Sequence, residues 1–107
     1  MDNPEIDELN LLHAHVCQAL GDPKRLQILY AIHEKPRRVS ILAEDLEMPQ
    51  PTVSRHLSIL RQRSLVSTER DGAGVTYFLA DTRIIEVLDM MRQVLRDALI
   101  RQSDALA

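Results

Sequence analysis

Polar and basic side chains gather in residues 50–61, where their types suit contact with nucleic acid. The set consists of Gln50, Thr52, Ser54, Arg55, His56 and Arg61. Glutamine can pair with the edge of adenine and arginine with guanine, while hydroxyl groups meet either base edges or phosphates. Arg70 follows in a short β-branched segment, placed to meet a phosphate or the minor groove. These residues predict a surface that reads double-stranded DNA.

Each of these residues also has a simpler interpretation. The outer side of residues 50–61 would be a solvated helix face, His56 would cap or pack, and Arg61 would be plain surface charge. The exposed basic face, together with the hairpin predicted after it, favours contact with DNA.

His13 and Cys17 are the other pair with chemical potential. They lie four residues apart and share a helix face, whereas His15 points away. Such a pair could begin a zinc or thiophilic-metal site completed by a second chain, or Cys17 could be a thiol that becomes modified. The favoured interpretation is a partly buried interface pair, so no metal or cofactor is expected. Cys17 is the only cysteine, which excludes an intramolecular disulfide and suits a reducing cytoplasm.

Apolar spacing and helix breakers predict the elements that position these side chains. Helices are expected over residues 5–20, 23–34, 40–46, 50–62 and 81–101, with a hairpin over 65–80. Asp22 is expected to cap the second helix, with Pro23 in its first turn, and Ser40 to cap the third. Leu26, Leu29 and Tyr30 are expected on the inner face of the second helix.

The predicted order defines a fold class. Two short helices joined by a brief break form a helix-turn-helix at about 40–62, and the hairpin at about 65–80 makes it winged. The fold is expected to be mainly α with a two-stranded β wing, in a single domain spanning 1–107.

Two apolar stripes exceed what one small core needs. The stripes comprise Leu9, Leu12, Val16 and Leu20 near the N-terminus, and Ile84, Leu88, Met91, Leu95 and Leu99 in the last helix. We expect them to bury against a second copy, so that the chain is a homodimer formed through its N- and C-terminal helices, with residues 81–101 as the C-terminal dimerisation helix.

Composition excludes several classes of protein. The chain has 107 residues, 45% hydrophobic and 27% charged, with a net charge of −3. No apolar run approaches the ~20 residues of a membrane span, and the N-terminus lacks the pattern of a signal peptide. Residues 50–70 carry four arginines against one acid, so basic charge is concentrated where DNA contact is predicted. No nucleophile–base pair or phosphate loop has a suitable spacing, so an enzyme is not expected.

Residues 19–80 resemble the ArsR/SmtB family of bacterial repressors. The resemblance is carried by ALGDPKRLQIL at 19–29, LAEDL at 42–46, QPTVSRHLSILR at 50–61, and LV at 65–66 through RDG at 70–72 to VTY at 75–77. It implies a homodimer that binds operator DNA and releases it when a ligand binds. The sequence departs from the family pattern at Glu47 and Ser64, where glycine is usual because positive φ is easiest for glycine.

The metal sites of the family are not matched. The Cys-x-Cys of arsenic and cadmium sensors is missing, because the segment Arg38–Leu42 contains no cysteine. Zinc-type members use two histidines in the last helix, and this chain has Arg83 and Val94 at those positions while it keeps Asp81 and Asp97. An arginine repels a cation and a valine cannot coordinate one, so both sites are expected to be absent.

These observations predict a sequence-specific DNA-binding transcriptional regulator, in the form of a ligand- or redox-responsive repressor. The alternative is a winged-helix protein-interaction module that does not bind DNA. The polar and basic outer face of residues 50–62 favours the first.

Overall fold

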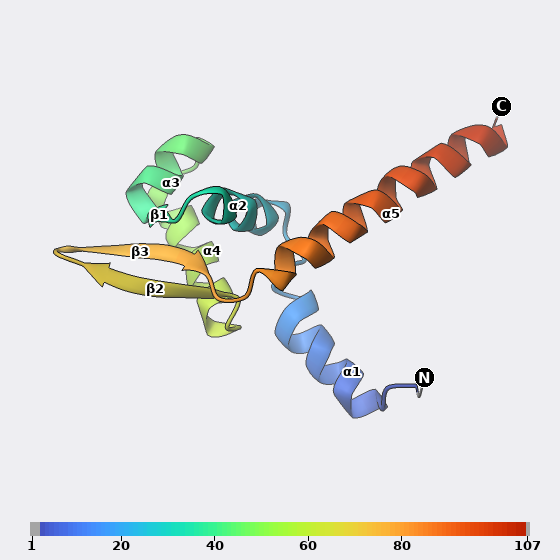
Figure 1. Cartoon of the computed structure of the whole chain (residues 1–107), viewed down its shortest axis with the longest axis horizontal. Helices are drawn as coiled ribbons and strands as arrows, with labels where there is room; N and C mark the ends of the chain where they lie inside the picture. The colour runs from blue at the N-terminus through green and yellow to red at the C-terminus, as the bar shows by residue number, and fades with distance from the viewer. Residues whose placement is uncertain (1–2, 107) are drawn as a thin grey trace.

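Three short helices pack against one another around the buried side chains. The computed structural model describes residues 3–106. Helices α2 (Pro23–Glu34), α3 (Val39–Leu46) and α4 (Gln50–Gln62) lie together beside the hairpin (Figure 1). The largest fully buried side chains are Ile28, Leu29, Ile32, Leu42, Val53, Leu57 and Leu60. Every one of them belongs to α2, α3 or α4, so these helices form the core of the fold.

The ends of α2 and α3 test the predicted caps. Asp22 Oδ1 accepts a hydrogen bond from the Lys24 amide at 2.7 Å, with Pro23 in the first turn, so the predicted cap of α2 is confirmed. The prediction for Ser40 is wrong, because α3 begins one residue earlier and Arg38 occupies its cap position without a side-chain bond.

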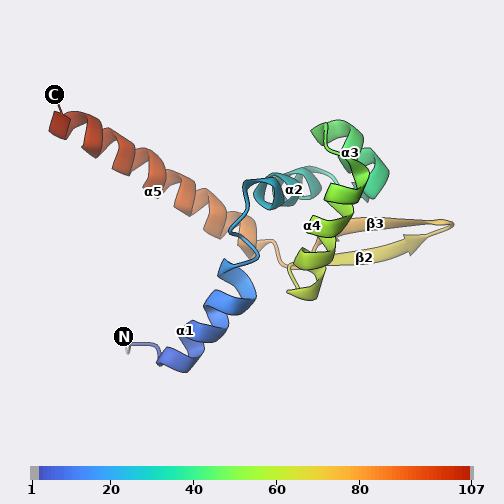
Figure 2. The same ribbon diagram turned by 180° about the vertical axis from the view of Figure 1, so that it is seen from behind.

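The wing is larger than the sequence indicated. Strands β2 (Val66–Asp71) and β3 (Gly74–Leu79) form the predicted antiparallel hairpin, which extends away from the helices (Figure 2). A third strand, β1 (Arg37–Arg38), pairs with the outer edge of β3 and gives the order β1-β3-β2. Arg37 pairs with Tyr77 and Arg38 with Thr76. The wing is thereby joined to the loop between α2 and α3.

Two residues other than glycine adopt the left-handed backbone conformation at the ends of helices. Glu47 has φ 54° in the turn between α3 and α4, and Ser64 has φ 61° after α4. Both angles confirm the expectation from sequence that these positions carry the conformation that glycine adopts most easily. The Met48 amide donates to the Ala43 carbonyl at 3.0 Å, so the turn satisfies the end of α3 in the manner of a glycine-ended helix.

The N- and C-terminal helices project from this body. α1 (Ile6–Leu12) continues into a π-helical turn, η1 (His13–Cys17), and α5 (Arg83–Leu106) extends in another direction (Figure 1). Only the start of α5 packs on the core, through Ile84, Ile85 and Leu88. None of the described helices is long and apolar enough to cross a membrane.

Both projecting helices expose large apolar side chains. On α1 these are Ile6, Leu9, Leu11 and Leu12, and on α5 they include Val87, Met90, Met91, Val94, Leu95, Leu99 and Ile100. Such a concentration on two helices is typical of a surface that a second protein chain covers. It agrees with the predicted homodimer, except that Ile84 and Leu88 are only 9% and 4% exposed and already pack within one chain. Val16 and Leu20 of the N-terminal stripe are also partly buried against the same core.

We predict that Leu95→Glu dissociates the dimer while leaving the monomer folded. Leu95 is 56% exposed in the single chain, so the substitution does not disturb the core, but in a dimer it would bury two unpaired carboxylates. Sedimentation velocity at micromolar concentration should show a monomer with unchanged helical circular dichroism. The matched control is Gln93→Glu, which adds the same charge at an exposed position on the other side of α5 from Leu95. A Leu95→Glu variant that remains dimeric would place the interface elsewhere.

Candidate nucleic-acid interface

Helix α4 has one buried and one exposed face. Val53, Leu57 and Leu60 are fully buried against the core. Four of the residues predicted to contact DNA are exposed on the remaining surface, namely Gln50, Ser54, Arg55 and Arg61, and Thr52 is half-buried. The first turn contains no acidic side chain. This helix therefore presents amide, hydroxyl and guanidinium groups outward, which are the groups that read base edges and phosphates.

The prediction that His56 contacts DNA is wrong. His56 is 5% exposed, because it lies next to Leu57 on the buried side of α4. Its Nδ1 lies 3.4 Å from Nη1 of Arg25 in helix α2, so its partner is inside the protein. The alternative interpretation of His56 as a packing residue is the one that the structure supports.

Arg25 connects three parts of the chain at this point. Its Nε donates to the Ala19 carbonyl at 2.6 Å and its Nη2 to the Gln18 carbonyl at 3.1 Å. Its Nη1 lies 3.4 Å from His56 Nδ1 and 4.0 Å from Asp22 Oδ2. The guanidinium thus joins the corner that follows η1 to the middle of α4, and the fixed fork of donors in arginine suits this role.

Burial sets the charge of His56. Removal of the imidazole from water lowers its pKa, and the positive charges of Arg25, Arg55 and Lys24 lower it further, against an opposing effect of Asp22. The neutral ring is therefore favoured in the folded protein, which allows Nδ1 to accept a hydrogen bond from Arg25.

The N-terminus of α4 offers fewer free amides than a typical helix. Pro49 is the cap residue and Pro51 has no amide hydrogen. The amides of Thr52 and Val53 both donate to the Pro49 carbonyl, at 3.0 and 3.2 Å. Few backbone amides here are therefore free to bind a phosphate, and the side chains of α4 become the main groups available to DNA.

The wing adds exposed cations beside α4. Arg70 is exposed near the hairpin turn, as expected. Arg38, which sequence reasoning did not select, also reaches the turn, where its Nη2 donates to the Asp71 carbonyl at 3.3 Å. The sequence signal that could have indicated Arg38 was the pair Arg37-Arg38. In a strand, neighbouring residues point to opposite faces, so one of the two would be exposed. A strand of only two residues, however, has no pattern by which it can be recognised in a sequence.

The arginines divide into two groups by their partners. Arg25, Arg37, Arg83 and Arg92 each form an ion pair with an aspartate. The described part of the chain shows no carboxylate within ion-pair distance of the other seven, which are Arg38, Arg55, Arg61, Arg63, Arg70, Arg96 and Arg101. The arginines of α4 and of the wing turn therefore carry charge that the protein itself does not neutralise.

Arg61 lies apart from the other residues of α4. It is near the C-terminal end of the helix and lines a shallow groove of about 360 Å³ with Ser64, Ser67 and Thr68. Six residues separate it from Arg55, which corresponds to about 9 Å along a helix. Arg61 is thus suited to a backbone phosphate outside the segment read by the first turns of α4.

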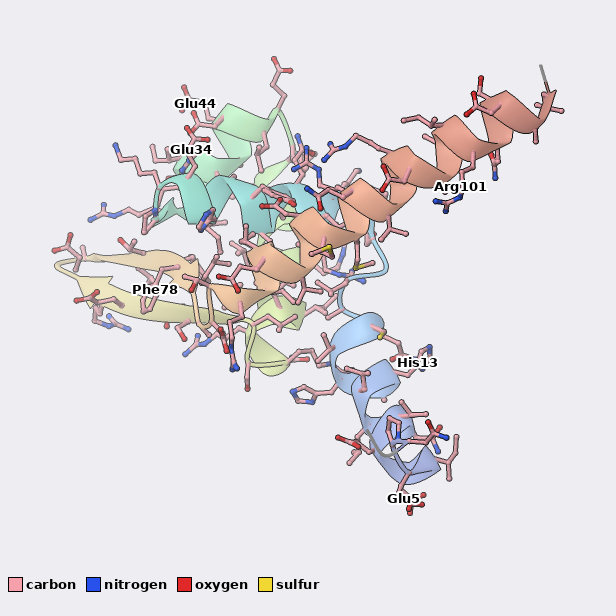
Figure 3. The ribbon with its side chains drawn as sticks, turned by 45° about the vertical axis from the view of Figure 1, so that its right-hand side comes forward. Glu5, His13, Glu34, Glu44, Phe78 and Arg101 are labelled. Carbon is pink, nitrogen blue, oxygen red and sulfur yellow. The ribbon has the colours of Figure 1, made fainter. Side chains whose placement is uncertain are left out.

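His13 and Cys17 lie in η1, at the base of the projecting N-terminal helix, and both are exposed. Figure 3 shows His13 on this helix. The prediction that they are partly buried therefore does not hold within one chain. Among residues 3–106 no three His, Cys, Asp or Glu side chains are grouped so that they could hold a metal ion. A metal at Cys17 would require ligands from a second chain.

This arrangement is a winged helix-turn-helix, with a polar and cationic recognition helix in α4 and a wing in β2–β3. Residues 22–68 match the ArsR family of bacterial regulatory proteins. An uncharacterized HTH-type transcriptional regulator of Methanocaldococcus jannaschii, MJ1325, is 33% identical over 82 residues, which cover 76% of this chain and 92% of that protein. The chain belongs to the ArsR family and is a DNA-binding transcriptional regulator.

Two further proteins bear on assembly and activity. The HTH-type transcriptional repressor SmtB of Mycobacterium tuberculosis is 40% identical over 83 residues, covering 77% of this chain and 62% of that protein. A solution structure of a homodimeric winged helix-turn-helix domain from Mycobacterium bovis superposes with a TM-score of 0.76 at 28% identity, covering 92% of this chain and 94% of that one. The expected winged helix-turn-helix fold is confirmed, and the homodimeric assembly is that of the Mycobacterium bovis domain.

We predict that the stability of the protein falls between about pH 7 and pH 5 because of His56. Its folded pKa lies below the unfolded value of 6.5, so the unfolded chain binds more protons and the free energy of unfolding decreases as the pH falls below that value. Urea titrations across this range should show a falling midpoint. His56→Asn, which keeps an acceptor for Arg25 but does not titrate, should show a smaller fall. Equal slopes for both proteins would contradict the assignment.

Proposed function

We propose that this regulator is a repressor that binds operator DNA in the cytoplasm with two recognition helices, one from each protomer. The observation that carries the proposal is the continuous exposed face of Gln50, Ser54 and Arg55 on α4. The guanidinium of Arg55 has no carboxylate partner among the described residues. In this assembly the first turns of α4 enter the major groove of DNA, and the two copies lie about 34–36 Å apart, one helical turn of DNA.

The contacts divide into two kinds. Gln50, Thr52, Ser54 and Arg55 lie in the first two turns of α4 and are proposed to read base edges. Arg61 and Arg70, at the far end of α4 and on the wing, are proposed to hold phosphates. Base contacts give preference for one sequence, whereas phosphate contacts strengthen binding to any duplex. Bound across a promoter, such a dimer would exclude polymerase and so repress transcription.

We predict that Arg55→Ala weakens binding to a preferred duplex by about 1–3 kcal/mol and reduces the preference over random DNA. The preferred duplex can be recovered by selection from a random library, and binding followed by fluorescence anisotropy at low salt. Arg101→Ala, which removes the same charge from the distant end of α5 (Figure 3), is the control and should bind normally. Recovery of no preferred duplex, or an unchanged affinity for Arg55→Ala, would favour the protein-interaction alternative.

We predict that Arg70→Ala weakens binding to preferred and random duplexes by the same factor. The loss of one phosphate contact per protomer should also reduce the slope of log affinity against log salt by about one for each protomer. Titrations at several salt concentrations measure both quantities. A change in sequence preference without a change in slope would instead make Arg70 a base-reading residue.

The signal that releases the DNA is a separate part of the proposal. Both metal sites of related sensors are expected to be absent, and Cys17 is an exposed thiol at the start of the connection to α2. We predict that, if oxidants, polysulfide, zinc, cadmium or arsenite release the protein from DNA, Cys17→Ser abolishes that release. Anisotropy with the selected duplex measures the response, and an equal response of the variant would exclude Cys17 as the sensor.

A further inference from the structure

Gly74, at the start of β3, leaves room for a neighbouring side chain. Its φ does not lie in the left-handed region, unlike that of Gly72 in the same turn, so its backbone is open to any residue. A Cβ built on Gly74 would overlap Cζ and Nε of Arg38, and its contact with Nη2 would also be too short. The missing side chain of Gly74 thus forms the space in which the guanidinium of Arg38 lies.

The side chain of Arg38 lies in this space, and its positive charge is not paired with a carboxylate of the described residues. Its Nη2 donates to the Asp71 carbonyl at 3.3 Å, which ties the side chain to the turn of the wing. The neighbouring Arg37 shows the opposite arrangement, because its donors bind the carbonyls of Lys35 and Ala31 and the carboxylate of Asp45. One arginine of the pair fixes β1 to the helices, and the other is exposed on the wing.

The wing needs this charge if it is to approach DNA. The hairpin of residues 66–79 contains Glu69, Arg70 and Asp71 as its only charged residues, which gives a net charge of −1. The two carboxylates of this hairpin oppose the attraction that Arg70 offers to a phosphate. Arg38 brings one positive charge to the same turn, so the wing and Arg38 together are neutral.

We propose that Arg38, seated on Gly74, is a DNA-binding residue that supplies a phosphate contact at the wing. This proposal rests on the proposed DNA-binding role of α4 and adds to it a residue from outside both the recognition helix and the hairpin. The contact comes from β1, so its position depends on the pairing of β1 with β3. This position matters because a guanidinium that already lies at the turn loses less conformational freedom on binding.

Two variants test the proposal, one by removing the charge and one by displacing it. Arg38→Ala should weaken binding to selected and random duplexes alike, by roughly threefold per lost contact and about tenfold per dimer, and reduce the salt slope by about one per protomer. Gly74→Ala keeps every charge and a permitted backbone, but forces the guanidinium out of its seat, so it should also weaken binding. In the Arg38→Ala background, Gly74→Ala should have no further effect on affinity.

The controls separate this proposal from the role of α4. Arg101→Ala should bind normally, and a urea titration of each variant shows whether the fold is intact. If Arg55→Ala weakens binding but Arg38→Ala and Gly74→Ala do not, the contact at Arg38 is refuted while the DNA-binding role of α4 stands. If Gly74→Ala weakens binding equally with and without Arg38, its effect comes from the turn, and the seat is refuted. If no variant loses selective DNA binding, Arg55→Ala included, the proposed function itself is refuted.

Discussion

The packing of one face of α4 determines the rest of the structure. Val53, Leu57 and Leu60 recur at helical spacing and are fully buried against α2 and α3, which fixes the rotation of α4 about its own axis. Once this face is buried, the polar residues between them can only face outward. The same three side chains therefore stabilise the fold and aim the DNA-reading surface, so a loss of packing at any of them would change both.

Arg25 adds a polar restraint to this apolar packing. It binds two carbonyls at the corner after η1 and lies against His56 of α4, so the base of the projecting N-terminal helix and the recognition helix are held by one side chain. A buried histidine is tolerated at this point because the neutral ring of His56 can accept a hydrogen bond from Arg25. The connection gives a direct physical route between the base of the projecting N-terminal helix and α4.

The sequence predicted much of this arrangement, and the differences have identifiable causes. Asp22-Pro23 and the Asp71–Gly74 turn marked their elements because cap and turn chemistry is local. The buried face of α2 was misplaced: Ile28, Ala31 and Ile32 are buried, whereas Leu26 and Tyr30 are only half-buried. That helix has apolar residues on several sides, so periodicity alone does not identify the one that meets the core.

Sequence reasoning predicted the candidate site correctly where the exposure of a residue follows from helical spacing. It was wrong where exposure depends on tertiary contacts. Gln50, Ser54 and Arg55 are exposed because they alternate with the buried stripe. His56 is adjacent to Leu57, and its burial depends on Arg25, thirty-one positions away. Arg38 was missed for a related reason, since its place on the wing comes from the pairing of β1 with β3.

The long exposed part of α5 makes folding and abundance interdependent. In the proposed dimer, a second chain would cover much of the apolar surface of α5, so the stability of the assembly would increase with the concentration of the protein. At low concentration the free chain would leave Val94, Leu95 and Leu99 in water, where proteases and other apolar surfaces can reach them. The cellular amount of such a dimeric regulator would therefore affect its lifetime as well as its occupancy of DNA.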